Sequence, residues 1–242
     1  MNSSPLVLRK VPGFEATAYA YLNEELVWLG ASEGSGHPRN AHQRWQPPRL
    51  ACDAKRLAAG ARSCLRQFDA LSPRGLLLWL TGRPLPFPLQ VAATRFDAIR
   101  AALERNDIDG FAAAAVRVLG LGHGLTPSGD DFVGGIFFAL AHAPRQAWAG
   151  ELGGVRASIR AAATTSTNVI SAALLDDLID GASHAPLHAL LAALQDDAPA
   201  AIASATRGLL RVGATSGADM LAGLLVALLT LPPQDCPATI PT

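Results

Sequence analysis

The chain has 242 residues, of which 50% are apolar and 17% are charged. Soluble domains usually carry about a quarter of charged residues, so we expect this chain to bury much of its surface rather than to be disordered. Lys and Arg together number 20, as do Asp and Glu, and the formal net charge is zero. Because no basic stripe lies among aromatic residues, nucleic acid is excluded as an expected partner, whereas the low charge permits a homo-oligomer.

The cysteines and the apolar segments indicate the compartment. Cys52, Cys64 and Cys236 have no CxxC spacing, so neither a disulfide framework nor a zinc site is expected. The first residues lack the apolar segment of a secretory signal peptide. The apolar run Met220–Leu231 is too short to cross a bilayer. The sequence therefore predicts a cytoplasmic protein that does not bind a membrane.

Residues 1–94 are predicted to form a β-containing N-terminal domain. The segment Phe14–Tyr21 alternates loosely, Leu26–Ala31 is a short apolar run, and Asn23-Glu24-Glu25 between them favours a hairpin. The stretch Ser32–Pro48, rich in Gly and Pro, is typical of a long loop, in which His37 and His42 are expected to be exposed.

The rest of this first part mixes element types. Lys55–Phe68 has apolar residues on one helical face and predicts a helix. The short apolar run Gly75–Leu80 favours a buried strand. Arg83–Pro88 contains three prolines and is typical of a linker.

Residues 95–242 are predicted to form a helical domain that carries the GLTPSGDD motif. Apolar residues recur there at three- and four-residue spacing. The expected helices are Phe96–Asn106, Gly110–Leu119, Asp131–His142, Ser158–Ile179, Leu187–Leu194, Pro199–Val212 and Ala218–Leu229. The fold class is thus α+β, with a β-containing N-terminal part followed by a mainly helical C-terminal bundle around one buried helix.

A short internal repeat links two of these helices. The segment TPSGDDFVGG, from Thr126, resembles TSGADMLAG, from Thr215. Aligned on Ser-Gly, Asp131 matches Asp219 and Gly135 matches Gly223. Two helices that start alike are expected to pack as a pseudo-symmetric pair with their N-termini at one end.

The glycine-rich turn before the first of these helices is the main candidate site. Gly120, Gly122 and Gly124 permit positive φ and a close approach of a ligand to the backbone. The helix N-cap is either Thr126, with Pro127 in the first turn, or Ser128 in a capping box with Asp131. In either case the exposed N–H groups at a helix start favour an anion. The segment lacks the Lys of a Walker A loop and the surroundings of a dinucleotide fingerprint.

Three residues of this segment are candidates for catalysis: Asp130, Asp131 and His123. Asp131 and Asp219 also suit plain helix caps, but Asp130 matches Ala218 in the repeat, so capping does not require it. Adjacent carboxylates can also hold a cation, so Mg²⁺ at Asp130 and Asp131 is a second option.

Several small and polar residues are candidates for binding a small anionic substrate. One group belongs to the turn, one to a hydroxyl-rich segment between apolar stretches, and one to the second copy of the repeat. They are Gly122, Gly124, Thr126, Ser128 and Gly129; then Thr165, Ser166, Thr167 and Asn168; then Thr215, Ser216, Gly217 and Asp219. For the hydroxyl-rich segment, a polar helix start is an equally good interpretation.

Three segments of the chain resemble one known family. In order, GLTPSGDDFVGG, TTSTNVISAALLDDLIDG and GATSGADMLAGLL are similar to a bacterial domain-of-unknown-function family that includes the AllH subunit of oxamate carbamoyltransferase. The resemblance covers most of the chain from Gly120 to Leu225, and the first segment is the most specific. It implies allantoin and purine catabolism, in which oxalurate and phosphate exchange with oxamate and carbamoyl phosphate, and it implies partner subunits.

Three functions remain open at this stage. The first is a carbamoyltransferase subunit that acts on small ureido or carboxylate anions, with backbone N–H groups of Gly122–Gly129 stabilising the reacting carbonyl oxygen. The second is a non-catalytic subunit that binds a small anion or organises an assembly. The third is a metal-dependent hydrolase that uses the pair Asp130 and Asp131.

Overall fold

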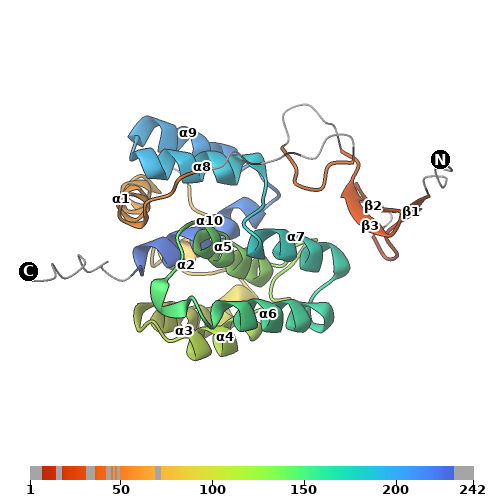
Figure 1. Ribbon diagram of the computed structural model, residues 1–242, viewed down its shortest axis with the longest axis horizontal. Coiled ribbons are helices and arrows are strands. Elements are labelled where there is room, and N and C mark those ends of the chain that lie inside the picture. Colours follow the sequence, from red (N-terminus) through yellow and green to blue (C-terminus); the bar gives the residue numbers. More distant parts are fainter. Residues whose placement is uncertain are drawn as a thin grey trace, which may run out of the picture.

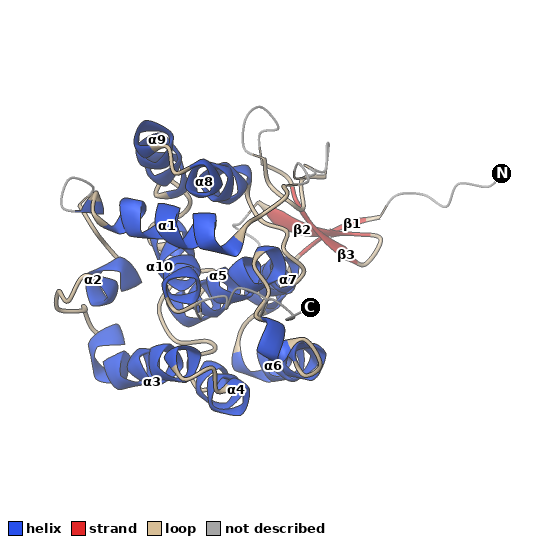
Figure 2. Ribbon diagram, turned by 60° about the vertical axis from the view of Figure 1, so that its left-hand side comes forward, coloured by secondary structure: helices blue, strands red, loops and turns tan. Residues whose placement is uncertain are grey.

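The protein has an α+β fold, as the sequence predicts. The computed structural model describes residues 7–14, 18–30, 36–41, 45, 47, 50–68 and 72–231. A small antiparallel sheet at the N-terminal end is followed by helices, and Figure 2 shows the sheet beside the helical body. Among the described residues, no helix is both long enough and apolar enough to span a membrane.

The predicted hairpin is present. The sheet has the order β1 (Leu8–Lys10), β2 (Tyr19–Leu22) and β3 (Glu25–Trp28). Leu22 pairs with Glu25, so Asn23 and Glu24 form a two-residue turn. Both have positive φ, 49° and 71°, which is the backbone that a type I′ hairpin requires. His42 and the rest of 42–44 lie outside the described residues.

The helices follow the predicted apolar periodicity with two exceptions. They are α1 (Ala54–Leu65), α2 (Leu76–Leu80), α3 (Ala93–Glu104), α4 (Ile108–Val116), α5 (Ser128–His142), α6 (Leu152–Ser166), α7 (Val169–Ile179), α8 (Ala185–Asp196), α9 (Pro199–Leu209) and α10 (Ser216–Leu229). Short 3-10 helices span Leu89–Ala92 and Gln146–Trp148. The elements from α3 onward confirm a mainly helical C-terminal part.

Two predicted elements are wrong. Gly75–Leu80 is not a strand, because Leu76–Leu80 forms the short helix α2. A short apolar run fits a buried strand and a buried helix turn equally well. Ser158–Ile179 is not one helix, because Thr167 adopts an extended backbone with ψ 178° between α6 and α7. Asn168 then caps α7, and its side chain accepts hydrogen bonds from the backbone N–H groups of Ile170 and Ser171.

The helices α5 and α10 form the centre of the bundle. Figure 1 shows this pair between α8 and α9 on one side and α3 and α4 on the other. A Cβ on Gly135 would collide with the Met220 carbonyl of α10, and one on Gly223 would collide with the Phe132 carbonyl of α5. The two glycines therefore let the helix backbones touch in a reciprocal way, which confirms the predicted pseudo-symmetric pair.

The symmetry extends to the turns that lead into both helices. Gly129 N–H donates to the Leu121 carbonyl, and Gly217 N–H donates to the Val212 carbonyl. These bonds tie each helix start to the end of the segment that precedes it, α4 or α9. The same type of backbone hydrogen bond thus holds both helix starts.

A smaller apolar cluster joins the N-terminal sheet to α7. It consists of Val11, Tyr19, Leu26, Ile170 and Leu174, all buried. Close by, the Arg39 guanidinium donates to both carboxylate oxygens of Asp177, at 2.7 and 2.8 Å. The sheet is therefore fixed to the helical body by burial and by an ion pair.

The proposed division of the chain at residue 94 stays a prediction. The part before residue 94 contains more than the sheet, because α1 and α2 also belong to it. The apolar side chains Leu57, Leu76 and Leu77 of these helices are buried in the large helical core. We therefore treat residues 1–94 as a β-containing part with two helices built into the bundle.

Candidate functional site

The starts of α5 and α10 are joined by reciprocal hydrogen bonds. Asp131 of α5 bonds to Ser216 of α10, and Asp219 of α10 bonds to Ser128 of α5. Neither helix has a side-chain cap at its N-cap position, Pro127 or Thr215. The expected capping boxes are therefore not formed, because each serine serves the other helix instead of its own.

A cavity of about 480 Å³ opens at these two helix starts. Its volume falls within the range of ordinary small-molecule sites. The helix-start side consists of residues from the two copies of the repeat and from the turns directly before them. They are Gly124, Leu125, Thr126 and Asp131 at the first copy and Gly213, Ala214, Thr215, Ser216 and Met220 at the second. The structure thus brings the two copies together around one space.

Asp131 is the buried carboxyl group that lines this cavity. Its side chain is only 5% exposed, and it bonds to Thr126 and Ser216. Its Oδ2 has no hydrogen-bond partner in the described part of the chain. Burial, together with the charge of Asp219, raises the pKa of Asp131 well above its usual value.

Asp219 lies behind Asp131, away from the cavity. It is 0% exposed, and its Oδ1 accepts a hydrogen bond of 2.6 Å from the backbone N–H of Leu76, at the start of α2. Within the described residues, its Oδ2 also lacks a partner. Burial raises the pKa of Asp219 to about 6, although the bonds from Leu76, Ser128 and Thr215 oppose the shift.

Asp130 faces a different set of partners. Its Oδ1 accepts from Gly120 N–H at 2.7 Å, and its Oδ2 accepts from the hydroxyls of Thr167 and Ser171 at 2.5 and 2.6 Å. Asp130 is 2% exposed and is absent from the cavity lining. Asp130 thus connects the glycine-rich turn to the residues at the start of α7. The predicted catalytic role of Asp130 stays a prediction that the cavity does not support.

The hydroxyl-rich segment holds the turn from outside. Thr167 binds Asp130, and the Asn168 amide donates to the Leu125 carbonyl at 2.8 Å. Thr165 donates to the carbonyl of Ala162 within its own helix and is exposed, as is Ser166. These four candidate binding residues lie outside the cavity lining.

The backbone N–H groups of the turn are partly used within the protein. Gly129 N–H donates to Leu121, and Gly120 N–H donates to Asp130. Gly122 and Gly124 have φ values of 120° and 106°, and Gly124 lines the cavity. Of the predicted anion cradle Gly122–Gly129, the cavity lining therefore includes Gly124, Leu125 and Thr126, together with His123, whose side chain is exposed at the rim.

The opposite wall comes from the N-terminal part, which sequence reasoning missed. His37 is 4% exposed, so the expectation that it faces solvent is wrong. Its ring stacks on Trp28 at 4.7 Å and meets His184 edge to face at 4.7 Å. All three residues line the cavity, together with Tyr19. The cause is tertiary, because the loop folds back over the start of α8.

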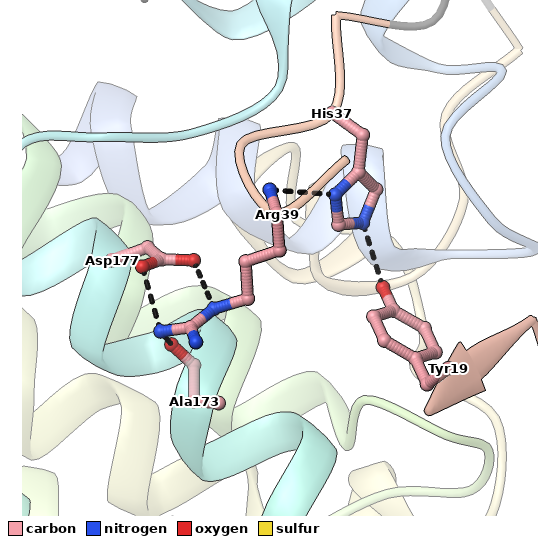
Figure 3. Close-up of polar contacts among 5 residues, drawn as sticks. All are labelled: Tyr19, His37, Arg39, Ala173 and Asp177. Carbon is pink, nitrogen blue, oxygen red and sulfur yellow. Dashed lines mark hydrogen bonds and ion pairs between the residues drawn. The ribbon is translucent and has the colours of Figure 1, made fainter. Parts of the chain in front are cut away.

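Hydrogen bonds fix the tautomer of His37 (Figure 3). Its Nδ1 accepts from Arg39 N–H at 3.0 Å, and its Nε2 lies 2.9 Å from Tyr19 Oη. Burial, with the neighbouring His184 and Arg39, lowers the pKa of His37 to about 3, so the ring is neutral. A neutral ring that accepts at Nδ1 carries its proton on Nε2 and donates it to Tyr19. Arg39 then connects this wall to Asp177 of α7.

Arg211 is a further cavity residue, and no sequence pattern pointed to it. It follows α9, lines the cavity and is exposed at its rim. In the part of the chain that the structure describes, its guanidinium has no ion pair. It offers a planar set of donors to a carboxylate or a phosphate group.

The proposed Mg²⁺ ligands do not face a common point. Asp130 binds Gly120, Thr167 and Ser171, whereas Asp131 binds Thr126 and Ser216. Over the described residues, no group of three or more His, Cys, Asp or Glu side chains could hold a metal ion. The Asp130–Asp131 pair therefore does not fit a shared divalent cation, and we derive no step through one.

Comparison with known proteins identifies a family for the central part of the chain. Residues 118–228 match the family described as oxamate carbamoyltransferase subunit AllH. This segment contains both helix starts and runs from the end of the α4 region into α10. The match supports the predicted AllH-like family. No curated protein and no solved structure matches the chain.

Proposed function

With residues 118–228 being AllH-like, we propose that this chain is a subunit of an oxamate carbamoyltransferase-like enzyme whose cavity binds the small anionic substrates. The reaction converts oxalurate and phosphate into oxamate and carbamoyl phosphate. One observation carries the proposal: both copies of the repeat inside the matched segment meet at one cavity. The family description speaks of a subunit, so the proposal includes partner subunits.

The cavity has the chemistry for a molecule that carries an amide at one end and an anion at the other. Asp131 Oδ2 is an unpartnered oxygen at the buried end of the helix starts. Arg211 supplies a positive charge at the rim. A carboxylate or phosphate group pairs with guanidinium, while an amide or ureido N–H meets the carboxyl group. Oxamate and oxalurate both have this two-ended character.

The remaining walls favour a small, partly planar guest. Trp28, His37 and His184 form an aromatic side of the cavity. Ser183 and Thr215 add hydroxyl groups to the lining. Polar groups placed in a mostly apolar pocket are the usual arrangement for orienting a small molecule.

Ligand binding tests the proposal directly. We expect oxamate or oxalurate to bind the purified chain and to raise its melting temperature, as do phosphate or carbamoyl phosphate. Saturation at a hundred times the dissociation constant stabilises a protein by about 2.7 kcal/mol. Urea and acetamide, which lack the anionic end, are the control ligands. If none of the four anions binds in calorimetry, the proposal fails.

A matched pair of arginine variants locates the binding site. Arg211→Ala should weaken oxamate binding by about tenfold or more, because a hydrogen bond to a charged group contributes roughly 1.5–3 kcal/mol. Arg207→Ala is the control, since Arg207 is also exposed, lies four residues earlier and is outside the cavity lining. Equal affinities of the two variants would place the anion elsewhere.

Catalysis is tested in the assembled enzyme. The chain is co-expressed with its partner subunits, and carbamoyl phosphate formed from oxalurate and phosphate is measured. Turnover that depends on this chain and falls with Arg211→Ala supports a catalytic subunit. Binding of oxamate combined with unchanged turnover in Arg211→Ala would support the alternative, a subunit that binds a small anion without carrying out the reaction.

A further inference from the structure

We infer that Asp131 and Asp219 share one proton across the starts of α5 and α10, and that Asp131 delivers this proton to the leaving nitrogen of the substrate. The inference rests on the proposed carbamoyl transfer and adds a catalytic site to it. Asp131 touches the cavity, so it is the catalytic residue. Asp219 acts through Asp131 and is a positioning residue.

The first support is the isolation of the two carboxyl groups from positive charge. Asp131 is 5% exposed and Asp219 is 0% exposed. In the described part of the chain, neither forms an ion pair, and the Oδ2 atom of each lacks a hydrogen-bond partner. Two buried and unpaired negative charges side by side are very unfavourable, so one proton between them removes the larger part of that cost.

The second support is the position of Asp131 at the cavity. Its carboxyl group lines the cavity together with Thr126 and Ser216, whose hydroxyl oxygens lie 2.7 Å apart. Its Oδ2 has no hydrogen-bond partner in the described part of the chain. A carboxylic acid at this position can therefore donate its proton to a bound substrate.

The surroundings favour one negative charge on the pair rather than two or none. On α5, Asp130 adds negative charge, and Asp177 of α7 is paired with Arg39. Tyr19 of the sheet is neutral, because burial raises its pKa. The positive influences are the N-terminal ends of α5 and α10 and the Leu76 N–H of α2. The other titratable groups of the cavity are His37, His123, His184 and Arg211. Buried Asp219, bonded to Leu76, is the natural holder of the charge.

The chemical step balances without a cofactor. An oxygen of monohydrogen phosphate attacks the carbamoyl carbon of oxalurate, and the bond from this carbon to the oxamate nitrogen breaks. Asp131 gives its proton to that nitrogen, which leaves as the amide of oxamate. The proton that phosphate loses returns to Asp131. The products are oxamate and carbamoyl phosphate, and the pair ends the cycle with the proton it began with.

Carbon-13 NMR of the protein labelled at aspartate carboxyl carbons tests the shared proton. In the wild-type protein at neutral pH, we expect one signal of the pair at the position of a protonated carboxyl group. Asp131→Asn and Asp219→Asn assign the two signals, and either variant suffices if the other does not fold. Asp109→Asn, an exposed residue in the first turn of α4, is the matched control. Two ionised carboxylates in the wild-type protein at neutral pH would overturn the inference.

The pH profile of the assembled enzyme tests the catalytic step. The rate should fall as pH rises through the pKa of Asp131, because the acid form is consumed. Asp219→Asn removes the neighbouring charge, so the fall should move to lower pH while KM for oxalurate changes little. An unmoved profile would overturn the positioning role of Asp219. If oxamate fails to bind, the proposed function fails; if oxamate binds but both aspartates are ionised, only this inference fails.

Discussion

The two helix starts, at Ser128 and at Ser216, have similar local packing, but their aspartates face different surroundings. Each has a glycine that lets it approach the preceding segment and a serine that bonds to the aspartate of the other helix. At the α5 start the aspartate, Asp131, faces the cavity, whereas at the α10 start Asp219 faces the core and α2. Two similar helix starts thus place one carboxyl group at the cavity and bury the other against α2.

A second difference concerns the residue before the aspartate. The α5 start has Asp130 there, and the α10 start has Ala218. Asp130 fastens its turn to α7 through Gly120, Thr167 and Ser171, and α7 also carries the contacts to the N-terminal sheet. The difference teaches that two similar helix starts can be attached differently, since only the α5 start has a carboxylate that bonds to the hydroxyl groups of Thr167 and Ser171.

The largest expected loss of stability comes from disrupting the close contact between the backbones of α5 and α10. Gly135→Ala and Gly223→Ala each place a Cβ against a carbonyl of the facing helix. We expect each to destabilise the protein by about 3 kcal/mol or more, because backbone cannot give way as a flexible side chain does. Denaturant unfolding measures the loss.

The control for these variants is a helical glycine with space around it. Gly154 in α6 has nothing within 4 Å of a built Cβ. Gly154→Ala should stabilise the protein by up to about 1 kcal/mol, since alanine favours a helix more than glycine. If Gly135→Ala and Gly223→Ala differ greatly from each other, the reciprocal packing is not the reason for these glycines.

The next largest effect tests what Asp130 contributes at the position that Ala218 occupies in the second helix start. Asp130→Ala leaves the Gly120 N–H and two hydroxyl groups without their acceptor. The expected loss is about 3 kcal/mol, because hydrogen bonds to a charged group are strong. Asp109→Ala on the exposed start of α4 should change the free energy of unfolding by less than about 0.5 kcal/mol. If the Asp130→Ala variant is fully stable but inactive, a catalytic role for Asp130 is supported instead.

The pH dependence of stability separates Asp219 from an ordinary carboxylate. Burial raises the pKa of Asp219 from 3.8 to about 6. The folded state therefore binds more protons than the unfolded state between these values, and stability falls as pH rises through this window. The decline amounts to about 3 kcal/mol, because the two pKa values differ by about 2.2 and each pKa unit corresponds to about 1.36 kcal/mol.

Asp219→Asn should flatten this decline. Its amide keeps an oxygen for the Leu76 N–H and carries no charge. Melting temperatures measured from pH 4 to pH 8 should then converge at low pH and favour the variant at high pH, with unchanged slopes for Asp109→Asn. A parallel decline in the variant would show that Asp219 is ionised at no cost in the folded protein.

The smallest expected changes in stability distinguish the exposed residues of the hydroxyl-rich segment from Thr167, which bonds to Asp130. Thr165→Ala and Ser166→Ala change exposed side chains and should alter the free energy of unfolding by less than about 0.5 kcal/mol. Thr167→Ala removes a bond to Asp130 and should cost about 1 kcal/mol or more. Thermal unfolding with and without oxamate measures both. An effect of Thr165→Ala on oxamate binding would contradict the cavity as the binding site.

Local pattern and composition predicted much of the fold. The spacing of apolar residues gave the positions of α1, α3, α5 and α10, and the polar residues after Leu22 gave the hairpin. The run at Leu76–Leu80 was misjudged because five apolar residues carry no period that separates helix from strand. The prediction of one helix over Ser158–Ile179 was wrong, but the alternative of a polar helix start in the hydroxyl-rich segment is confirmed, because Asn168 caps α7.

The neighbouring aspartates show where sequence reasoning about the site ended. Adjacent residues on a helix point in directions about 100° apart, since a turn has about 3.6 residues. Asp130 and Asp131 therefore face different neighbours, and the sequence cannot tell which one meets a ligand. The comparison with Ala218 favoured Asp130 as the functional residue, whereas in the structure Asp130 bonds to Gly120, Thr167 and Ser171 and Asp131 lines the cavity.

By itself, the sequence determined the helical periodicity, the pairing of two similar helix starts and the likeness to one family, because these depend on residues near one another in the chain. The tertiary structure alone decided the rest of the site. His37 and Tyr19 line the cavity. Arg39 lies outside the lining and connects this wall to α7 through its ion pair with Asp177, 138 residues away in the chain. No local pattern records such a contact, because burial and charge pairing are fixed only when the sheet closes over α7.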